Sequence, residues 1–84
     1  MSEPVRQIID YIVREIIRRP SVKIDEDMPL VSSGLIDSLA LVDILLKLEE
    51  VTKMRIPAGK VQAKDMDTVR LMFSTVARVG KPRM

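Results

Sequence analysis

Apolar residues recur three or four positions apart in several stretches of this chain of 84 residues, and no stretch alternates apolar and polar residues as a half-buried strand does. The first stretch contains Val5, Ile8, Ile9, Ile12 and Ile16. This spacing predicts an amphipathic helix from about Ser2 to Arg18. Pro20 follows closely, and a proline disfavours helical geometry in the residue before it.

The rest of the chain predicts three further helices, the middle one short. They cover about residues 38–51, 58–63 and 68–79. The break Ile56-Pro57 precedes the short helix, and either Asp67 or Thr68 is expected to cap the last one. Residues 80–84 are expected to fray. Because a chain this short builds one core, we expect a single all-α domain of 84 residues.

The chain has no cysteine and no histidine. Disulfides and metal sites made of thiolate or imidazole are therefore excluded, and carboxylates are the remaining metal ligands. The densest carboxylate run, Asp25-Glu26-Asp27, is interpreted as a solvated loop. The first residues form neither a basic leader nor a long apolar run, so no signal peptide and no membrane span is expected. We expect a monomeric cytoplasmic protein.

Charge is distributed unevenly along the chain, although its formal net charge is only +2. Residues 1–24 carry five basic and three acidic residues, residues 25–50 carry one and seven, and residues 51–84 carry eight and two. Such asymmetry affects how partners are steered more than it affects the fold. Only Tyr11 and Phe73 are available to stack on bases, which weakens a nucleic-acid-binding interpretation.

A serine stands where the second long helix is expected to begin, within the sequence Gly34-Leu35-Ile36-Asp37-Ser38-Leu39. Asp37 is a good N-cap, which places Ser38 at an exposed helix start after a long loop. Serine acts as a nucleophile when a base lies within hydrogen-bond reach, and the usual base, histidine, is absent. Ser38 is therefore predicted to be modified rather than to catalyse. The positive end of the helix dipole would favour a phosphate there.

The helix expected at residues 38–51 has more apolar residues than one buried face needs. One stripe is typical of a core face and contains Leu41, Ile44, Leu45, Leu48 and Val51. A second stripe consists of Leu39, Val42 and Leu46 and is bordered by Asp43, Glu49 and Glu50. This second stripe indicates an acid-rimmed docking surface, and the alternative is a central helix buried on two sides.

The order and spacing of these features together resemble the acyl carrier protein family over nearly the whole chain. The resemblance rests on the run Asp27-Met28-Pro29-Leu30, residues 34–39, the acidic second helix, Ile56-Pro57 and Asp67-Thr68-Val69. It implies a small antiparallel four-helix bundle with a short third helix. It also implies a non-enzymatic carrier whose Ser38 bears a 4'-phosphopantetheine arm from coenzyme A, which supplies the thiol that the chain lacks.

The resemblance implies further roles residue by residue. Asp37 is the acid beside Ser38 that the phosphopantetheinyl transferase recognises. Partners bind the apolar residues Leu39, Val42 and Leu46 and the flanking acids Asp43, Glu49 and Glu50. The core, or a cleft for the cargo, is lined by Ile44, Leu48, Ile56 and Val69. The implied partners are the transferase, a ligase that activates an acyl group or an amino acid, and a downstream synthase or acyltransferase.

Three departures from housekeeping fatty-acid carriers indicate a specialised stand-alone carrier. Two residues, Leu35 and Ile36, separate Gly34 from Asp37, where one is typical. Thr52 replaces a common aromatic after the paired acids, and the final third is basic. We therefore expect a dedicated lipid or secondary-metabolite pathway, with acyl and aminoacyl cargo both open. The alternative is a helical protein-interaction module, or a basic nucleic-acid-binding module, without a prosthetic group.

Overall fold

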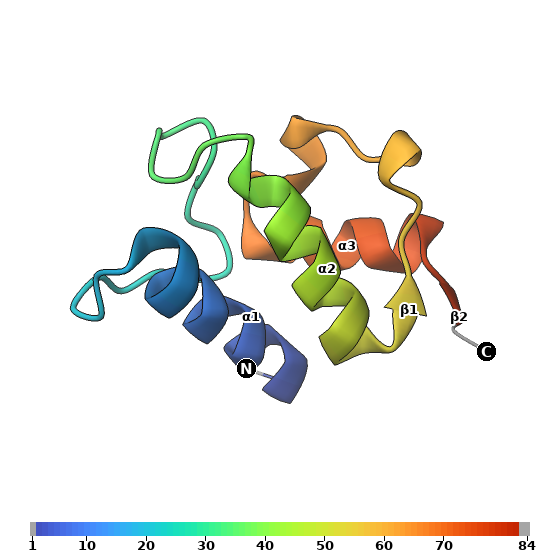
Figure 1. Cartoon of the computed structure of the whole chain (residues 1–84), viewed down its shortest axis with the longest axis horizontal. Coiled ribbons are helices and arrows are strands. Elements are labelled where there is room, and N and C mark those ends of the chain that lie inside the picture. The colour runs from blue at the N-terminus through green and yellow to red at the C-terminus, as the bar shows by residue number, and fades with distance from the viewer. Residues whose placement is uncertain (1, 83–84) are drawn as a thin grey trace.

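The computed structural model describes residues 2–82, in which three main helices pack together (Figure 1). The helices are α1 (Glu3–Tyr11), α2 (Ala40–Thr52) and α3 (Val69–Val79). Shorter elements are the π-helical segment η1 (Ile12–Ile17), the 3-10 turns η2 (Ala58–Lys60) and η3 (Ala63–Met66), and the strands β1 (Met54–Arg55) and β2 (Lys81–Pro82). None of the helices in this described part is long and apolar enough to span a membrane.

The helical stretch formed by α1 and η1 together begins and ends close to where the sequence predicts. The Ser2 hydroxyl accepts a hydrogen bond from the Val5 N–H at 3.4 Å, and Pro4 lies in the first turn, where its missing N–H is not needed. The helix then widens into η1, whose last bond runs from the Arg18 N–H to the Val13 carbonyl oxygen at 2.8 Å. Arg18 ends it in the left-handed conformation, with φ at 61°. The π-helical geometry was not predicted.

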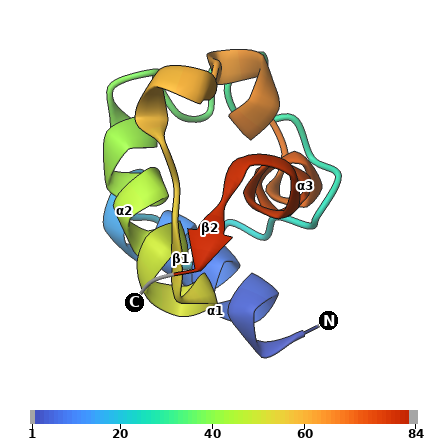
Figure 2. The same cartoon turned by 90° about the vertical axis from the view of Figure 1, so that its right-hand side faces the viewer.

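The core lies where the three helices and the loop before α2 meet. Helix α1 contacts both α2 and α3. Figure 2 shows α2 and α3 on opposite sides of the molecule, with the 3-10 turns crossing above the space between them. The buried apolar residues are Val5, Ile8, Ile12, Ile24, Leu30, Ile36, Leu41, Ile44, Leu48, Ile56, Met66, Val69, Met72 and Val76. Their burial is the main favourable contribution to folding.

The all-α class predicted from the sequence is confirmed, with two differences in detail. The short third helix is replaced by the separate turns η2 and η3. The chain also forms a small antiparallel pairing that was not predicted, with Arg55 opposite Lys81 and Met54 opposite Pro82. We expected residues 80–84 to fray, but the pairing includes Lys81 and Pro82; residues 83–84 lie outside the described part.

The start of α3 distinguishes between its two predicted caps. The Thr68 hydroxyl accepts a hydrogen bond from the Leu71 N–H at 3.0 Å, so Thr68 is the N-cap. Asp67, the other candidate, points its carboxylate elsewhere, to the loop that precedes α2.

Candidate functional site

The carboxylate of Asp67 is one of two groups that attach the loop leading to α2 to the rest of the molecule. Asp67 accepts hydrogen bonds from the backbone N–H groups of Val31 and Ser32, each at 2.8 Å, and from the Ser32 hydroxyl at 2.8 Å. The Asp67 carbonyl oxygen also accepts from the Leu30 N–H at 2.7 Å. These hydrogen bonds hold the pKa of the Asp67 carboxyl below its usual value, and the bond from the Ser32 backbone N–H has the largest effect. The sequence did not reveal this role, because the partners lie more than thirty positions apart.

Arg70, in the first turn of α3, makes a second attachment to the same loop. Its Nε donates to Asp27 Oδ1 at 2.6 Å, and its Nη2 lies 3.2 Å from Glu26 Oε2. The hydrogen bond from Arg70 lowers the pKa of the Asp27 carboxyl. The acidic run, predicted to be a solvated loop, is therefore partly paired. Residues 2–82 contain no group of three or more side chains arranged to hold a metal ion.

Leu35 and Ile36, the two residues between Gly34 and Asp37, have different surroundings in the turn before α2. Gly34 has φ at +80°, in the left-handed region that favours glycine. The Ile36 N–H then donates to the Leu30 carbonyl oxygen at 3.0 Å, and the Ile36 side chain is only 4% exposed. Leu35 is 38% exposed. One of the two residues thus anchors the loop in the core, and the other remains on the surface near Ser38.

Ser38 lies in a tight turn that leads into α2. The Asp37 carboxylate accepts a hydrogen bond from the Ala40 N–H at 3.0 Å, which is the capping interaction predicted for Asp37. The regular helix begins at Ala40 rather than at Ser38, because the Leu41 N–H donates to the Ser38 carbonyl oxygen three residues back, at 3.3 Å. Ser38 is exposed, and its hydroxyl forms no hydrogen bond with the rest of residues 2–82.

The surroundings of Ser38 contain no base that could activate its hydroxyl as a nucleophile. The nearest acid in sequence, Asp37, is engaged in capping, and the chain has no imidazole to remove the hydroxyl proton. The backbone N–H groups of Ser38 and Leu39 have no partner within the described residues. Free N–H groups at a helix start favour a phosphate, so the residues present fit a phosphodiester on this hydroxyl.

Three apolar side chains follow Ser38 along the surface of α2 and define the α2 apolar face. Leu39, Val42 and Leu46 are 82%, 61% and 60% exposed. On the other side of the helix, Leu41, Ile44 and Leu48 are 8%, 0% and 0% exposed. The alternative of a central helix buried on two sides is therefore wrong for residues 2–82.

The three acids predicted to border this face have different surroundings. Asp43 is exposed, and Glu50 is exposed with its carboxylate 3.6 Å from the Lys47 ammonium. Glu49 is half-buried, and its carboxylate accepts a hydrogen bond from the Ile56 N–H at 2.8 Å. Glu49 therefore fixes the chain after α2, a structural role that sequence reasoning missed. Asp43 is exposed without an ion pair in the described part, and Glu50 stays exposed although it pairs with Lys47, so a partner can reach both.

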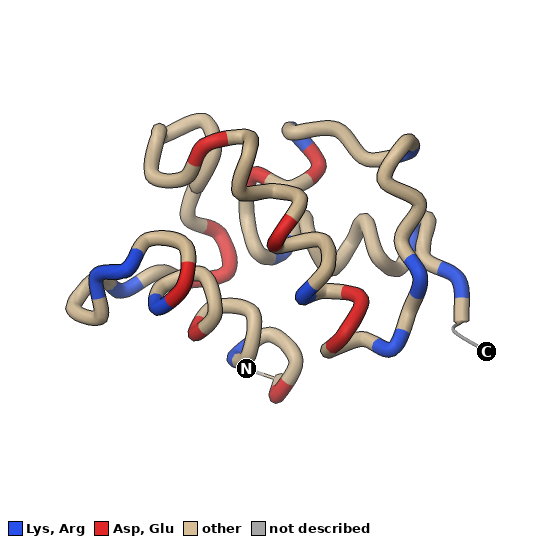
Figure 3. Tube along the Cα trace, viewed as in Figure 1, with Lys and Arg blue, Asp and Glu red and all other residues tan. Residues whose placement is uncertain are grey.

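The negative charge of α2 extends to the neighbouring helix α1. Figure 3 shows acidic residues distributed along α2 and the loop before it. Burial raises the pKa of Tyr11, and the carboxylates of Asp43, Glu15 and Glu50 raise it further. The Lys47 ammonium lies 5.6 Å from the centre of the Tyr11 ring and is the nearby cation in this region.

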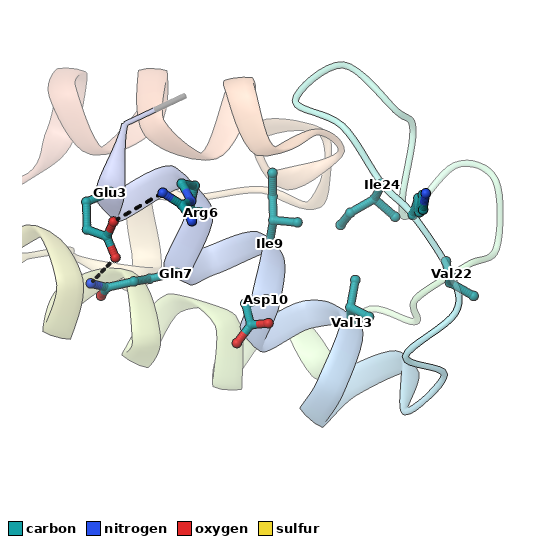
Figure 4. A pocket seen from close by; sticks show the side chains of 9 residues that line it. Glu3, Arg6, Gln7, Ile9, Asp10, Val13, Val22 and Ile24 are labelled. Carbon is teal, nitrogen blue, oxygen red and sulfur yellow. Dashed lines mark hydrogen bonds and ion pairs between the residues drawn. The ribbon is translucent and has the colours of Figure 1, made fainter.

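The residues predicted to line either the core or a cleft for the cargo belong to the core. Ile44, Leu48, Ile56 and Val69 are all buried. A surface hollow of about 590 Å³ lies instead between α1 and residues 22–24 (Figure 4). Its apolar side chains include Ile9, Val13 and Val22, and no residue of α2 lines it.

A comparison with known families identifies the family of the chain. The family described as "Phosphopantetheine attachment site" matches residues 7–77. No curated protein and no solved structure matches the chain significantly. The family match covers the second half of α1, the loop that leads to α2, all of α2 and nearly all of α3. The chain therefore belongs to the phosphopantetheine attachment family of acyl-carrier-type proteins, which bear covalently attached 4'-phosphopantetheine.

Proposed function

We propose that the chain is a non-catalytic carrier that holds an acyl or aminoacyl group as a thioester on a phosphopantetheine arm attached to Ser38. The observation that carries the proposal is the exposed Ser38 hydroxyl, free of internal hydrogen bonds, beside free N–H groups in a chain without histidine. The arm supplies the thiol that forms the thioester.

The chain's own residues have limited and distinct tasks in this proposal. Ser38 Oγ would accept the phosphopantetheinyl group as the pyrophosphate bond of coenzyme A breaks and adenosine 3',5'-bisphosphate leaves. The N–H groups of Ser38 and Leu39 would stabilise the negative charge of the resulting phosphodiester. Asp37 holds the turn through Ala40, so the hydroxyl stays at the surface. Since no base within the described residues contacts Ser38, the proton of its hydroxyl must pass to the transferase.

Intact-mass measurement tests the attachment. The protein is incubated with coenzyme A and a broad-specificity phosphopantetheinyl transferase, and we expect the mass to rise by one phosphopantetheine. The variant Ser38→Ala is expected to gain nothing. Ser74→Ala, which removes another exposed serine, serves as the matched control and should be modified normally. An addition that persists in Ser38→Ala would refute the assignment.

The α2 apolar face, together with Asp43 and Glu50, is the proposed docking surface for the transferase, an activating ligase and a downstream synthase or acyltransferase. Its support is the exposure of three large apolar side chains beside two accessible carboxylates. Partners that fit it present basic residues around a shallow apolar patch. Charge then governs mainly the association rate, and apolar contact governs mainly the dissociation rate.

The proposed pathway is a specialised one for a lipid or a secondary metabolite. Its support is the exposed Leu35 near Ser38 and the excess of basic residues after residue 50. Because the core is closed, a long acyl chain would have to open it, whereas an amino acid would remain at the tip of the arm. Backbone amide shifts on loading distinguish these cases. Changes at Ile44, Leu48 and Val69 indicate a buried acyl chain, and changes confined to the surroundings of Ser38 indicate an exposed cargo.

A further inference from the structure

The strand pair at the far end of α2 places like charges opposite each other. Arg55 of β1 faces Lys81 of β2 in the antiparallel register, and both side chains are exposed. Like charges directly opposite in a sheet destabilise the pairing. Lys53, immediately before β1, is also exposed and adopts the left-handed conformation with φ at 58°. We call these three residues, Lys53, Arg55 and Lys81, the basic strand end.

Nothing within residues 2–82 neutralises these cations by an ion pair. The ion pairs there involve Arg6, Arg14, Lys47, Arg70 and Arg78. The two acids in the last turn of α2 are engaged elsewhere, since Glu50 lies against Lys47 and Glu49 accepts the Ile56 N–H. Figure 3 shows basic positions following α2 and continuing on β2. Three exposed cations without an ion pair therefore lie together at this end of the molecule, where an anionic group of another molecule can reach them.

We propose that the basic strand end is a second docking surface, and that it binds an acidic segment of a partner protein. The chain has one acidic region and one basic region, so a complementary partner has a basic region and an acidic region. Its middle, residues 25–50, is acidic and its last third is basic. A partner that is basic opposite the α2 apolar face and acidic opposite the strand end binds the carrier in one orientation only.

The surroundings of the basic strand end favour a protein over other anionic partners. Large exposed apolar side chains are Leu35, Leu39, Val42, Leu46 and Leu71, none of them in or next to the strands, and three cations without an apolar anchor hold a membrane weakly. The two aromatic residues lie in α1 and α3, so no base-stacking platform accompanies the cations. A second copy, binding by its acidic middle, would make a head-to-tail contact, and such contacts build rings or filaments rather than a two-fold dimer.

A titration tests the surface without requiring modification of Ser38, so its outcome is independent of the proposed carrier function. Decaglutamate peptide is added to the isotopically labelled, unmodified chain, and backbone amide shifts are followed. We expect the changes to concentrate at residues 53–55 and 81 and to disappear at high salt. Lys81→Glu should weaken binding by about fivefold or more, given the weight of close charge pairs at interfaces.

Lys23→Glu is the matched control, because Lys23 is also exposed and unpaired within residues 2–82 but lies in the loop beside α1. It should leave the affinity for the peptide within about twofold, since rim charges contribute little. Equal weakening by Lys23→Glu would refute a specific surface. Tighter binding of a DNA duplex or of phosphatidylserine vesicles, or concentration-dependent self-association through residues 53–55, would refute the proposed partner.

Thermal stability gives a second, independent measurement. Lys81→Glu converts the pair of like charges opposite Arg55 into a pair of opposite charges. We expect the melting temperature to rise by about 1 to 5 °C even though peptide binding falls. Lys81→Gln should give a smaller rise. A lower melting temperature in both variants would show that the cations do not repel each other, and it would overturn the argument for an external anion.

Discussion

The two sides of α2 are built from the same aliphatic residue types and have opposite surroundings. Leu41, Ile44 and Leu48 pack in the core, whereas Leu39, Val42 and Leu46 face solvent. Burying either stripe would be favourable, since transfer of a leucine side chain out of water contributes roughly 1.5 to 3 kcal/mol. The difference shows that residue type alone does not assign a side chain to the core. An exposed stripe of this kind indicates contact with another molecule.

The largest expected effect is a difference in the free energy of unfolding between variants on the buried and the exposed side of α2. Leu48→Ala should lower the free energy of unfolding by about 2 to 5 kcal/mol, because it leaves a cavity in a fully buried position. Leu46→Ala, two residues away on the exposed side, should change it by less than about 0.5 kcal/mol. Urea unfolding of both variants measures the difference. Similar losses in the two variants would mean that the distinction between the sides is wrong.

The next largest effect is expected from a substitution that weakens the attachment of the loop before α2 and leaves α2 itself unchanged. Asp67→Asn weakens three hydrogen bonds to residues 31 and 32 and should lower the free energy of unfolding by about 1 to 2 kcal/mol. Asp43→Asn is the control, because the Asp43 side chain is exposed and forms no hydrogen bond in the described part.

The same carboxyl predicts a pH dependence. Its pKa is lower in the folded protein than the usual 3.8, so its contribution is complete above pH 3.8 and is lost as the pH falls through the folded pKa. Asp67→Asn should remove this part of the acid sensitivity, which unfolding at a series of pH values measures. An unchanged pH profile would show that the Asp67 contacts contribute no stability.

The smallest expected effect concerns partner binding. Val42→Ala and Leu46→Ala should each slow modification of Ser38 by about fivefold to tenfold, as central apolar contacts do at interfaces, and should leave the fold intact. Leu71→Ala is the matched control, because Leu71 is an exposed leucine on α3. Transferase kinetics at equal protein concentration measure the effect. If Leu71→Ala slowed the reaction equally, the α2 apolar face would lose its special role.

Local patterns predicted much of this fold. Apolar spacing gave the bounds of α2, of α3 and of the stretch formed by α1 and η1 within about two residues, and it also separated the two sides of α2. A helix face depends mainly on residues three and four positions apart, so sequence shows it directly. The position of Ser38 after Asp37 and the absence of histidine predicted a modified serine, and the resemblance to acyl carrier proteins implied which group it bears. The attachment at Ser38 stays a prediction.

Contacts between distant residues could not be predicted in this way. Asp67 looked like a helix cap, because nothing in its local sequence indicates the N–H groups of Val31 and Ser32. Strands β1 and β2 have two residues each and carry no alternating pattern. Glu49 was assigned to the docking surface, since the reversal of the chain that brings the Ile56 N–H to its carboxylate depends on tertiary structure.

The length of α2 sets a spacing between the two surfaces proposed here. Ser38 lies just before this helix and Lys53 just after it, and 13 helical residues at about 1.5 Å each separate them by roughly 20 Å. One inserted residue would lengthen the helix by about 1.5 Å and rotate one end by about 100° relative to the other. A partner that contacts both ends therefore requires a fixed number of residues in α2, whichever side chains that helix carries.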